Sequence, residues 1–366
     1  MERLGLNGMQ ISARARSSLF TSSCKTIVGL ILVTMVTLPG CHSSENPGDN
    51  NIRIGWQVPW ATQGQLVQVL KHSDALKVNG LRGDFKGFTY GAPLNEAALA
   101  GEVDVIFTAD QPAATLLAKN ASWTIVARLM YNRVAIYVPP DSDMQTVSDL
   151  KGKRIGMPFG AAAQRDAMKA ILEAGLDPKN DVTSINLDIS EQNNIVQSGS
   201  RKKWGEIDAL VGFDPTPAIF EYKGVARMLH IGQVVSLVLM SNEYLRKSPN
   251  EATRFLKAFI ESWYYYATHR AETNEWFRSE SRLQVDSQIL EVAAAVEPNV
   301  QAKSIKDVRV TLSPEDLTVI QEAAKFLYQQ GMTRSEVQMA QHYDSRFINN
   351  AFRDAVNANQ PIRAPQ

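Results

Sequence analysis

The chain has 366 residues, with 38 basic and 38 acidic side chains, so its formal net charge at pH 7 is zero. Hydrophobic residues make up 44% and charged residues 21%, ordinary globular values that argue against wholesale disorder and against a polytopic membrane protein. A zero net charge also argues against a nucleic-acid-binding protein, which would carry a basic excess. Two cysteines, Cys24 and Cys41, are too few for a disulfide framework or a cysteine-rich metal site.

The N-terminal segment has the pattern of an export signal. Residues 1–25 contain four basic residues and one acid, and residues 26–38 (TIVGLILVTMVTL) form an apolar run of 13 residues. Because a membrane-spanning helix needs roughly 20 residues, this pattern predicts a secretory signal. Residues 38–41 (LPGC) resemble the lipobox of bacterial lipoproteins. The resemblance implies that residues 1–40 are a lipoprotein signal peptide and that Cys41 is lipidated; the alternative is a plain signal peptide with an incidental cysteine.

A polar stretch precedes the folded body. Residues 41–51 lack an apolar segment and contain Pro and Gly, so we interpret them as a flexible tether. Strand-like and helix-like segments then alternate, with strands expected at 52–58, 85–90, 103–108, 124–129 and 134–138, and helices at 65–76, 94–100 and 112–118. This alternation predicts a mostly parallel sheet covered by helices.

A second alternating series follows the turn at residues 139–141 (PPD). Strands are expected at 154–157, 182–187, 207–211, 225–230 and 234–240, and helices at 162–174, 191–197 and 215–222. The last third is helical by its spacing, at 249–269, 287–296 and 314–330. We therefore predict an α/β protein of two lobes, each with its own parallel or mixed sheet, in which residues 52–139 and 236–366 form lobe 1 and residues 140–235 form lobe 2. The helical third should pack on lobe 1.

Five stretches, in this order, resemble the extracytoplasmic substrate-binding proteins of ABC importers, in particular the aliphatic-sulfonate, taurine and nitrate group. They are IRIGWQ (52–57), YGAPLNEAALAGEVDV (90–105), TADQPA (108–113), DLKGKRIGMPFGAAA (149–163) and GEIDALVGFDP (205–215). The resemblance runs from residue 52 to about residue 269. It implies a bilobed periplasmic-binding-protein fold (type II-like) with hinge crossovers, a small-molecule ligand, an ABC permease as partner, and no cofactor. We expect an extracytoplasmic, membrane-anchored monomer.

Three strand-to-helix junctions are the candidate ligand-binding elements. Free N–H groups at helix N-termini bind anions, and open α/β sheets bind ligands beyond the carboxyl ends of their strands. The alternative is that these Gly- and Pro-containing junctions are simple turns. The junction residues that we select are Gly91, Ala92, Asp110, Gln111, Phe159, Gly160 and Ala161.

Aromatic and acidic residues near these junctions complete the candidate site. Trp56 and Trp60 could stack on a ligand or pack in the core, and Phe159 and Phe213 are expected as apolar walls. Asp110 and Asp214 either hold a ligand amine or hydroxyl or cap the following helix, with the cap favoured for Asp214. Arg165 fits a surface arginine better than a ligand anchor. A hydroxyl donor that the related proteins often have after the glycine is replaced here by alanine.

The sequence predicts a binding protein rather than an enzyme. It contains no G-x-S-x-G, Walker A, H-E-x-x-H or G-x-G-x-x-G motif, and its five histidines have no metal-ligand spacing. We expect capture of a sulfonate-, taurine- or nitrate-like oxyanion or other small organic ligand, by hinge motion near Pro139 and near Val234–Val235, for delivery to a permease. The alternatives are a ringed vitamin precursor of the thiamine-pyrimidine type, a sensory binding protein and, less favoured, an enzyme on the same fold. The residues 263–266 (WYYY) are expected to pack inward rather than to form a partner surface.

Overall fold

The computed structural model describes residues 50–358 and 362–364. The predicted signal peptide, Cys41 and most of the tether lie outside the described residues. The strands are β1 (Asn51–Gln57), β2 (Arg82–Phe88), β3 (Val105–Ala109), β4 (Trp123–Val138), β5 (Arg154–Met157), β6 (Thr183–Asn186), β7 (Ala209–Phe213) and β8 (Arg227–Ser241).

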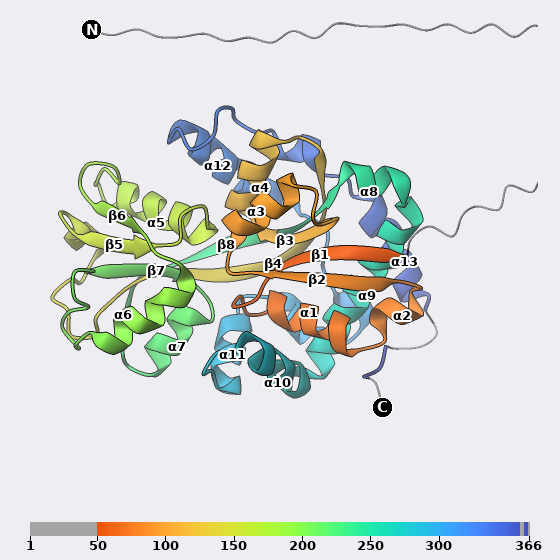
Figure 1. The fold of residues 1–366 in the computed structure, drawn as a ribbon, viewed down its shortest axis with the longest axis horizontal. Helices are drawn as coiled ribbons and strands as arrows, with labels where there is room; N and C mark the ends of the chain where they lie inside the picture. Colours follow the sequence, from red (N-terminus) through yellow and green to blue (C-terminus); the bar gives the residue numbers. More distant parts are fainter. Residues whose placement is uncertain (1–49, 359–361, 365–366) are drawn as a thin grey trace, which may run out of the picture. The chain divides into compact units, whose positions relative to one another are not determined.

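Helices connect these strands and make up the last third of the chain (Figure 1). The α-helices are α1 (Gln63–His72), α2 (Ala75–Val78), α3 (Gly91–Leu99), α4 (Asp110–Lys119), α5 (Ala162–Glu173), α6 (Gln192–Ser198), α7 (Thr216–Tyr222), α8 (Asn242–Lys247), α9 (Pro249–Thr268), α10 (Arg270–Ser281), α11 (Ser287–Ala294), α12 (Pro314–Gln329) and α13 (Arg346–Val356). Short 3-10 helices are η1 (Val147–Leu150), η2 (Ile189–Glu191), η3 (Pro298–Gln301), η4 (Ile305–Asp307) and η5 (Met339–His342).

The strands form one mixed sheet of eight in the order β2-β1-β3-β8-β4-β7-β5-β6. Strand β1 is parallel to β2 and β3, and β5 is parallel to β6 and β7. The two parallel groups are joined by β4 and β8, which are antiparallel to each other and to the neighbouring strands β3 and β7. The predicted α/β class is confirmed, but the two expected sheets are continuous with each other.

The continuity comes from two strands that the sequence pattern divided. We expected breaks at residues 130–133 and 231–233, where polar residues and a glycine interrupt the apolar pattern. In the structure these residues stay in the ladder, with Asn132 paired to Val234 and Arg133 to Gln233, and irregular register elsewhere in β4. Because backbone hydrogen bonds hold a strand together whatever its side chains, a polar interruption does not by itself end it.

Alternating side chains of the strands pack into two hydrophobic cores, one on each face of the sheet. In β3, Val105 and Phe107 pack with the apolar residues of α1 and α9, whereas Ile106 packs with α3, α4 and α12. This is the two-residue period of a strand that is covered on both faces. Figure 1 shows α3, α4 and α12 on one side of the sheet and α1, α9 and α10 on the other.

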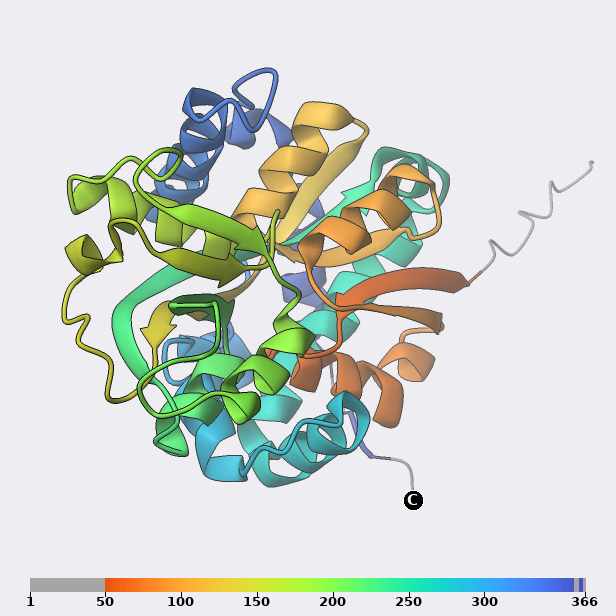
Figure 2. The same cartoon turned by 60° about the vertical axis from the view of Figure 1, so that its left-hand side comes forward.

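The C-terminal helices contact both parallel groups: most pack on the β1–β3 group, as we expect, and α11 packs on the other. Helix α9 packs on α1, α2 and α13, and α12 packs on α4. Helix α11, however, packs on α7, and its residues Ile289 and Leu290 share an apolar cluster with Ile219 and Phe220 (Figures 1 and 2). The amphipathic spacing predicted α11 but did not determine which surface it covers.

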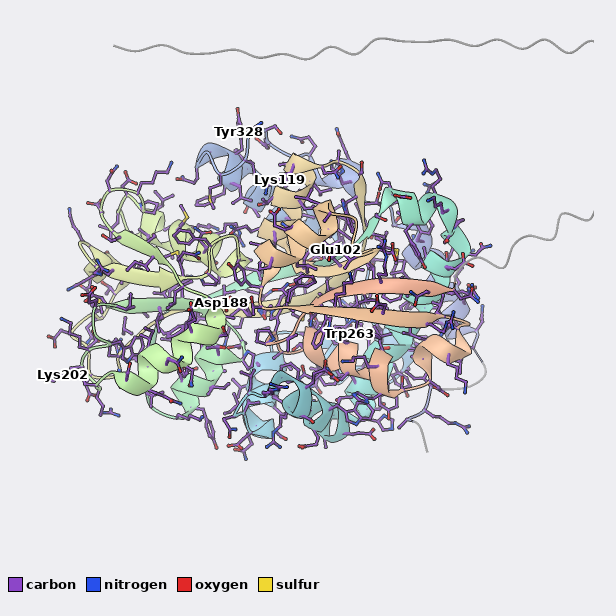
Figure 3. All side chains as sticks on the ribbon, viewed as in Figure 1. Glu102, Lys119, Asp188, Lys202, Trp263 and Tyr328 are labelled. Carbon is purple, nitrogen blue, oxygen red and sulfur yellow. The ribbon has the colours of Figure 1, made fainter. Side chains whose placement is uncertain are left out.

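The aromatic run of α9 is directed into the protein. Trp263 (labelled in Figure 3) and Tyr266 are fully buried, Tyr265 is nearly so, and Tyr264 is partly exposed. The expected inward packing of this run is therefore confirmed for three of its four rings. Within residues 50–358 and 362–364, no helix combines the length and the apolar character needed to cross a membrane.

Candidate functional site

The carboxyl ends of the two parallel groups meet at the middle of the β4–β8 pair. Ala109, the last residue of β3, pairs with Ser236, and Phe213, the last residue of β7, pairs with Val134. Since Val134 itself pairs with Gly232 of β8, both strand ends reach the same part of the sheet. This is the place where open α/β sheets bind ligands.

Three helices begin at this point. Helix α3 follows β2, α4 follows β3 directly, and α5 follows β5 after a short turn. The residues that precede their first turns, Tyr90, Ala109 and Ala161, make no side-chain hydrogen bond to the first-turn amides. The amides at these helix ends therefore depend on other groups for acceptors.

The helix starts surround a small cavity. Its free volume is about 20 Å³, which suffices for a water-sized group. It is lined by residues of both parallel groups and of the central strands: Gln57, Trp60, Gly91, Ala109, Pro112, Asn132, Val134, Ala161, Ala162, Ala163, Phe213 and Val234. Of the predicted site residues, Trp60, Gly91, Ala161 and Phe213 are brought together here.

Two predicted glycines allow close approach of the helices. A side chain at Gly91 would place its Cβ 2.7 Å from the Pro112 ring, and one at Gly160 would place its Cβ 2.9 Å from the Cβ of Ala92. Gly160 also has a φ of 85°, which favours glycine. Gly160 and Ala92 thus form a contact between the start of α5 and the start of α3, beside the cavity.

Trp60 fills much of the space between the groups. Its Nε1 donates to Oδ1 of Asn132 over 2.7 Å, and its ring meets Phe213 edge-on, with 6.2 Å between ring centroids. The side chain is 2% exposed. Trp60 is therefore a wall of the cavity with its polar end satisfied by the protein.

Asp110 and Gln111 are engaged by α5. Nη2 of Arg165 donates to Oδ2 of Asp110 over 2.8 Å, and the Arg165 amide donates to Oε1 of Gln111 over 3.0 Å. Burial raises the pKa of Asp110, and the Arg165 charge opposes that shift. Arg165 is 6% exposed, so the expectation of a surface arginine is wrong. The pair connects the first turn of α4 with that of α5.

Further hydrogen bonds link the same two regions. Nε2 of Gln111 donates to Oε1 of Gln164 over 3.3 Å, and that oxygen also accepts from the Gly160 amide over 2.8 Å. The hydroxyl of Thr89 donates to Oδ2 of Asp188 (labelled in Figure 3) over 2.9 Å. In the structure, the two parallel groups of strands and their helices are therefore held together across the cavity.

Asp214 has a comparable role on the other side. Its carboxylate accepts from Arg133 through Nε over 2.7 Å and through Nη2 over 3.2 Å, and from the Ala218 amide of α7 over 3.2 Å. Burial raises the pKa of Asp214, and the hydrogen bond from Arg133 opposes that shift. The carboxylate thus contacts the first turns of α7, as the capping alternative predicts, and does not line the cavity.

Trp56 and Phe159 lie away from the cavity lining. Trp56 is buried in the core beneath α1, with Nζ of Lys71 5.4 Å from its ring centroid. Phe159 is 37% exposed, and its amide donates to Oδ1 of Asn186 over 3.1 Å. A ligand in the cavity as it stands would contact neither ring.

Residues 89–273 match the NMT1/THI5-like family. The chain belongs to this family. Its fold is similar to that of the alkanesulfonate-binding protein SsuA from Xanthomonas axonopodis pv. citri bound to MOPS, with 22% identity over 81% of this chain and 98% of that chain and a TM-score of 0.68. The periplasmic aliphatic sulphonate-binding protein SsuA from Escherichia coli matches with 20% identity over 80% and 91% of the two chains and a TM-score of 0.64.

An enzyme also has this fold. A mutant of DSZB in complex with biphenyl-2-sulfinic acid matches with 15% identity over 83% of this chain and 99% of that chain, with a TM-score of 0.62, and DSZB is a desulfurization enzyme. No curated protein sequence matches the chain. These comparisons confirm the periplasmic-binding-protein fold and the expected family, and the family match includes every lining residue except Gln57 and Trp60.

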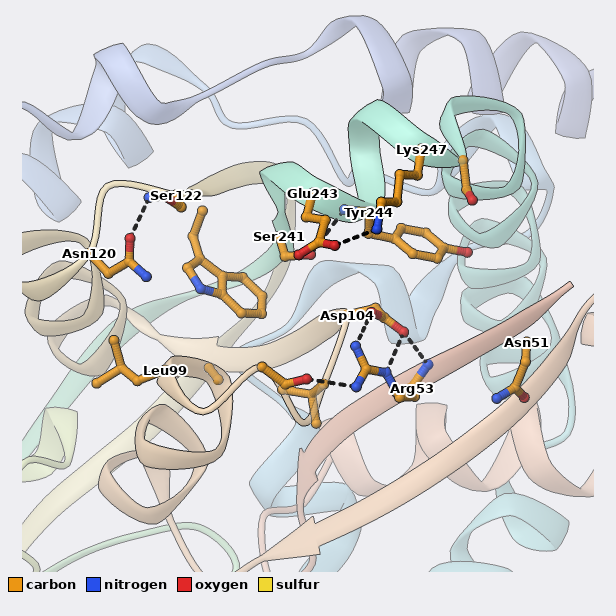
Figure 4. Close-up of a pocket in the computed structure, with 15 residues that line it drawn as sticks. Asn51, Arg53, Leu99, Asp104, Asn120, Ser122, Ser241, Glu243, Tyr244 and Lys247 are labelled. Carbon is orange, nitrogen blue, oxygen red and sulfur yellow. Dashed lines mark hydrogen bonds and ion pairs between the residues drawn. The ribbon is translucent and has the colours of Figure 1, made fainter. Parts of the chain in front are cut away.

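A larger hollow lies at the opposite ends of the strands in this family member. It has a volume of about 550 Å³ and lies beside the first residues of β1 and the last of β8 (Figure 4). Its charged groups are paired within the protein: Arg53 with Asp104 over 2.6 Å, and Lys247 with Glu243 over 2.6 Å. Because it lies away from the carboxyl strand ends and the helix N-termini, we place the functional site in the smaller cavity.

Sequence reasoning missed several lining residues. Asn132, Val134 and Val234 lie in the middle of long strands, and Gln57 ends β1. The one available signal was the polar pair Asn132-Arg133 within an otherwise apolar segment. Among the described residues, no group of three His, Cys, Asp or Glu side chains is arranged to hold a metal ion.

Proposed function

We propose that this protein is the substrate-binding component of an ABC import system, which captures a small oxyanion or organic ligand at the central cavity and delivers it to a membrane permease. The observation that carries the proposal is the gathering of three helix N-termini around one cavity at the carboxyl ends of the strands, two of them, α3 and α5, without an acidic residue in the first turn. The sulfonate-binding proteins that share the fold support the same interpretation.

The charge distribution favours an anionic group between α3 and α5. Neither helix has an acidic residue in its first turn, whereas α4 begins with Asp110, whose own Oδ1 accepts from the Gln111 amide over 2.6 Å. The N-terminus of α4 thus already carries a carboxylate. We therefore expect the ligand anion at the junction formed by Gly91 and Gly160.

The lining supports binding rather than covalent chemistry. Its side-chain amides belong to Gln57 and Asn132, its one other polar side-chain group is the indole N–H of Trp60, and the rest is apolar or backbone. Such a lining orients a ligand but supplies no nucleophile or general base. Trp60 and Phe213 favour a ringed ligand as the second candidate, because flat aromatic surfaces stack on rings.

Ligand entry requires the parallel groups to separate, since the cavity as it stands admits only a water-sized group. We propose that residues 52–139 with 236–366 move as one lobe and residues 140–235 as the other. Bending is then expected where β4 and β8 cross between the groups, near Asn132 and Val234–Val235, rather than at Pro139 beyond the end of β4. Closure follows because only the closed state offers the contacts of both lobes.

Location and anchoring belong to the same proposal. An extracytoplasmic binding protein has to stay close to its permease, and lipidation of Cys41 would achieve this through the tether of residues 41–51. The predicted partners are thus a small ligand and an ABC permease, with no cofactor.

A thermal-shift screen tests the proposal. The purified protein is heated with ethanesulfonate, taurine, MOPS, nitrate and a thiamine-type pyrimidine; a ligand at 100 times its Kd adds about 2.7 kcal/mol of stability. Hits are then titrated against Gly160→Ala and, as the matched control, Gly175→Ala. Both glycines have positive φ, but a side chain at Gly175 meets nothing within 4 Å. We expect affinity to fall at least about tenfold in Gly160→Ala only.

The outcomes are distinct. An anionic hit that is lost in Gly160→Ala supports the anion junction. A hit confined to the pyrimidine favours the aromatic alternative. No stabilisation by any compound, or equal affinity of the two alanine variants, contradicts the proposed site.

A further inference from the structure

The connection between β1 and α1 contains a buried residue in an unfavourable backbone conformation. Thr62 has φ 68° and ψ −57°, although it is β-branched, and it is 2% exposed. Side chains are rarely tolerated at positive φ, least of all β-branched ones. The one other described non-glycine residue with positive φ, Arg282, is exposed at the end of α10, where a left-handed residue is common. Thr62 is therefore the strained position of this fold.

Several hydrogen bonds hold Thr62 in this conformation. Its amide donates to Oε1 of Gln65 over 2.6 Å, and the Gly64 amide donates to the Trp60 carbonyl over 2.9 Å. Gln63 closes the base of the loop, because Oε1 accepts from the Gln57 amide over 2.8 Å and Nε2 donates to the Gln57 carbonyl over 3.2 Å. Strain of this kind persists only where the surroundings enforce it, and it concentrates in functional loops.

The same loop places Trp60 in the ligand cavity. Two residues before Thr62, the indole donates to Asn132, contacts Phe213 and leaves about 20 Å³ free. The Ala61 amide also donates to the Asp214 carbonyl over 3.3 Å. The Trp60 ring, two residues before the strained Thr62, thus occupies space that an organic ligand needs.

We propose that Trp60 is a displaceable plug of the ligand cavity and that Thr62 is the positioning residue that holds it there. In the plugged state, which the structure shows, the Thr62 backbone is strained and the indole is bonded to Asn132. In the ligand-bound state the loop has moved, the indole has left Asn132, and Thr62 has relaxed to negative φ. The inference rests on the proposed ligand-binding function. It adds that the loop strain favours displacement of Trp60 and so contributes to ligand affinity.

Two substitutions of Thr62 separate the effect of its backbone conformation from the effect of its side chain. Thr62→Ala removes the hydroxyl and the branch but keeps a Cβ at positive φ, so the strain remains. Thr62→Gly removes the Cβ as well, and with it the strain. The difference between the two variants reports the backbone conformation, since both lose the outer side-chain atoms.

Hydrogen–deuterium exchange of the full-length protein without ligand is the first test. If the plug opens to a relaxed state, Thr62→Gly stabilises the plugged state, and the amides of residues 60–64 exchange roughly fivefold or more slowly than in Thr62→Ala, even after the greater flexibility of glycine is counted. Exchange in β3, as the folding control, is the same in both variants. Equal exchange at residues 60–64 overturns the proposal.

Affinity for a compound that binds the wild type is the second test. Relief of strain on binding makes Thr62→Gly bind about fivefold or more weakly than Thr62→Ala. Equal affinities mean that Trp60 is a fixed wall, which overturns the plug but not the binding function. If none of the screened compounds binds the wild type, the proposed function loses its support, and the exchange measurement still decides whether the loop opens.

Discussion

Breaking the ion pair between Asp110 and Arg165 tests whether the two helix starts are held together by charge. The side chains are 0% and 8% exposed, and their closest atoms are 2.8 Å apart. Arg165→Met removes the cation but keeps a long apolar side chain, and it leaves a buried carboxylate without its partner. Removal of one partner of a buried pair costs about 3–5 kcal/mol. At roughly 2 °C per kcal/mol for a protein of this size, Tm should fall by about 6–10 °C.

The stability lost in Arg165→Met should depend on pH, and the structure determines whether the loss grows or shrinks as pH rises. Burial raises the pKa of Asp110 above its ordinary value of 3.8, and in Arg165→Met the opposing charge is gone, so the pKa rises further. A folded-state pKa above the unfolded one means that the folded protein binds the proton more tightly. The stability of the variant therefore falls as pH rises from about 3.8 to the raised pKa, and it recovers on acidification.

Thermal unfolding at pH 5 and pH 8 gives the measurement. Lys169→Met is the matched control, because it makes the same change on α5 at an exposed position and should stay within about 0.5 kcal/mol of the wild type. Asp110→Asn combined with Arg165→Met should recover most of the loss, since no buried charge remains. A loss below about 1 kcal/mol, or one of the same size at both pH values, would refute the reasoning.

Three further predictions concern the anchor, the second tryptophan and a histidine. A lipid analogue should label the wild type and Cys24→Ser but not Cys41→Ser; label in Cys41→Ser would contradict the lipobox interpretation. Trp56→Leu should destabilise the fold by about 2–4 kcal/mol, because it removes a buried ring, yet leave ligand affinity unchanged. Loss of affinity without loss of stability would instead show that Trp56 contacts the ligand. The hydrogen bond that the His230 ring donates to Asp166 raises the pKa of His230, so an NMR titration should show that pKa falling in Asp166→Asn; an unchanged pKa would rule out the pair.

The parts of the site that were predictable from the sequence are those with a local signal. Gly91 and Ala161 were selected because a turn between a strand and a helix carries its own residue types, and these turns lie at the strand ends wherever the strands run. Trp60 and Phe213, which also line the cavity, each adjoin a turn between a strand and a helix. Local chemistry was sufficient at these positions.

The remaining features depend on residues far apart in the chain. Arg165 looked exposed on α5 because nothing near it in sequence indicates Asp110, which lies 55 residues earlier. Asn132 and Val234 reach the cavity because β4 and β8 continue through a predicted break, and only the strand register shows this. The strain at Thr62 is an exception, because the hydrogen bonds that hold it come from residues 57–65, yet a threonine before a helix ordinarily predicts an unstrained cap.

Under the proposed function, the two buried ion pairs explain how the cavity would accept an anion although two acidic residues lie near it. Asp110 is the first residue of α4, and Asp214 lies two residues before α7. An unpaired carboxylate at either place would occupy the positive end of the helix and repel an incoming anion. Each is instead paired with an arginine that offsets its charge, Asp110 with Arg165 and Asp214 with Arg133, which also pairs with the more exposed Glu221. The electrostatic potential in the cavity is then determined mainly by the N-termini of α3 and α5, which have no acidic residue in their first turns. Under the proposed function, selection of a ligand anion would thus depend on helix amides, which have fixed direction, rather than on a mobile cationic side chain.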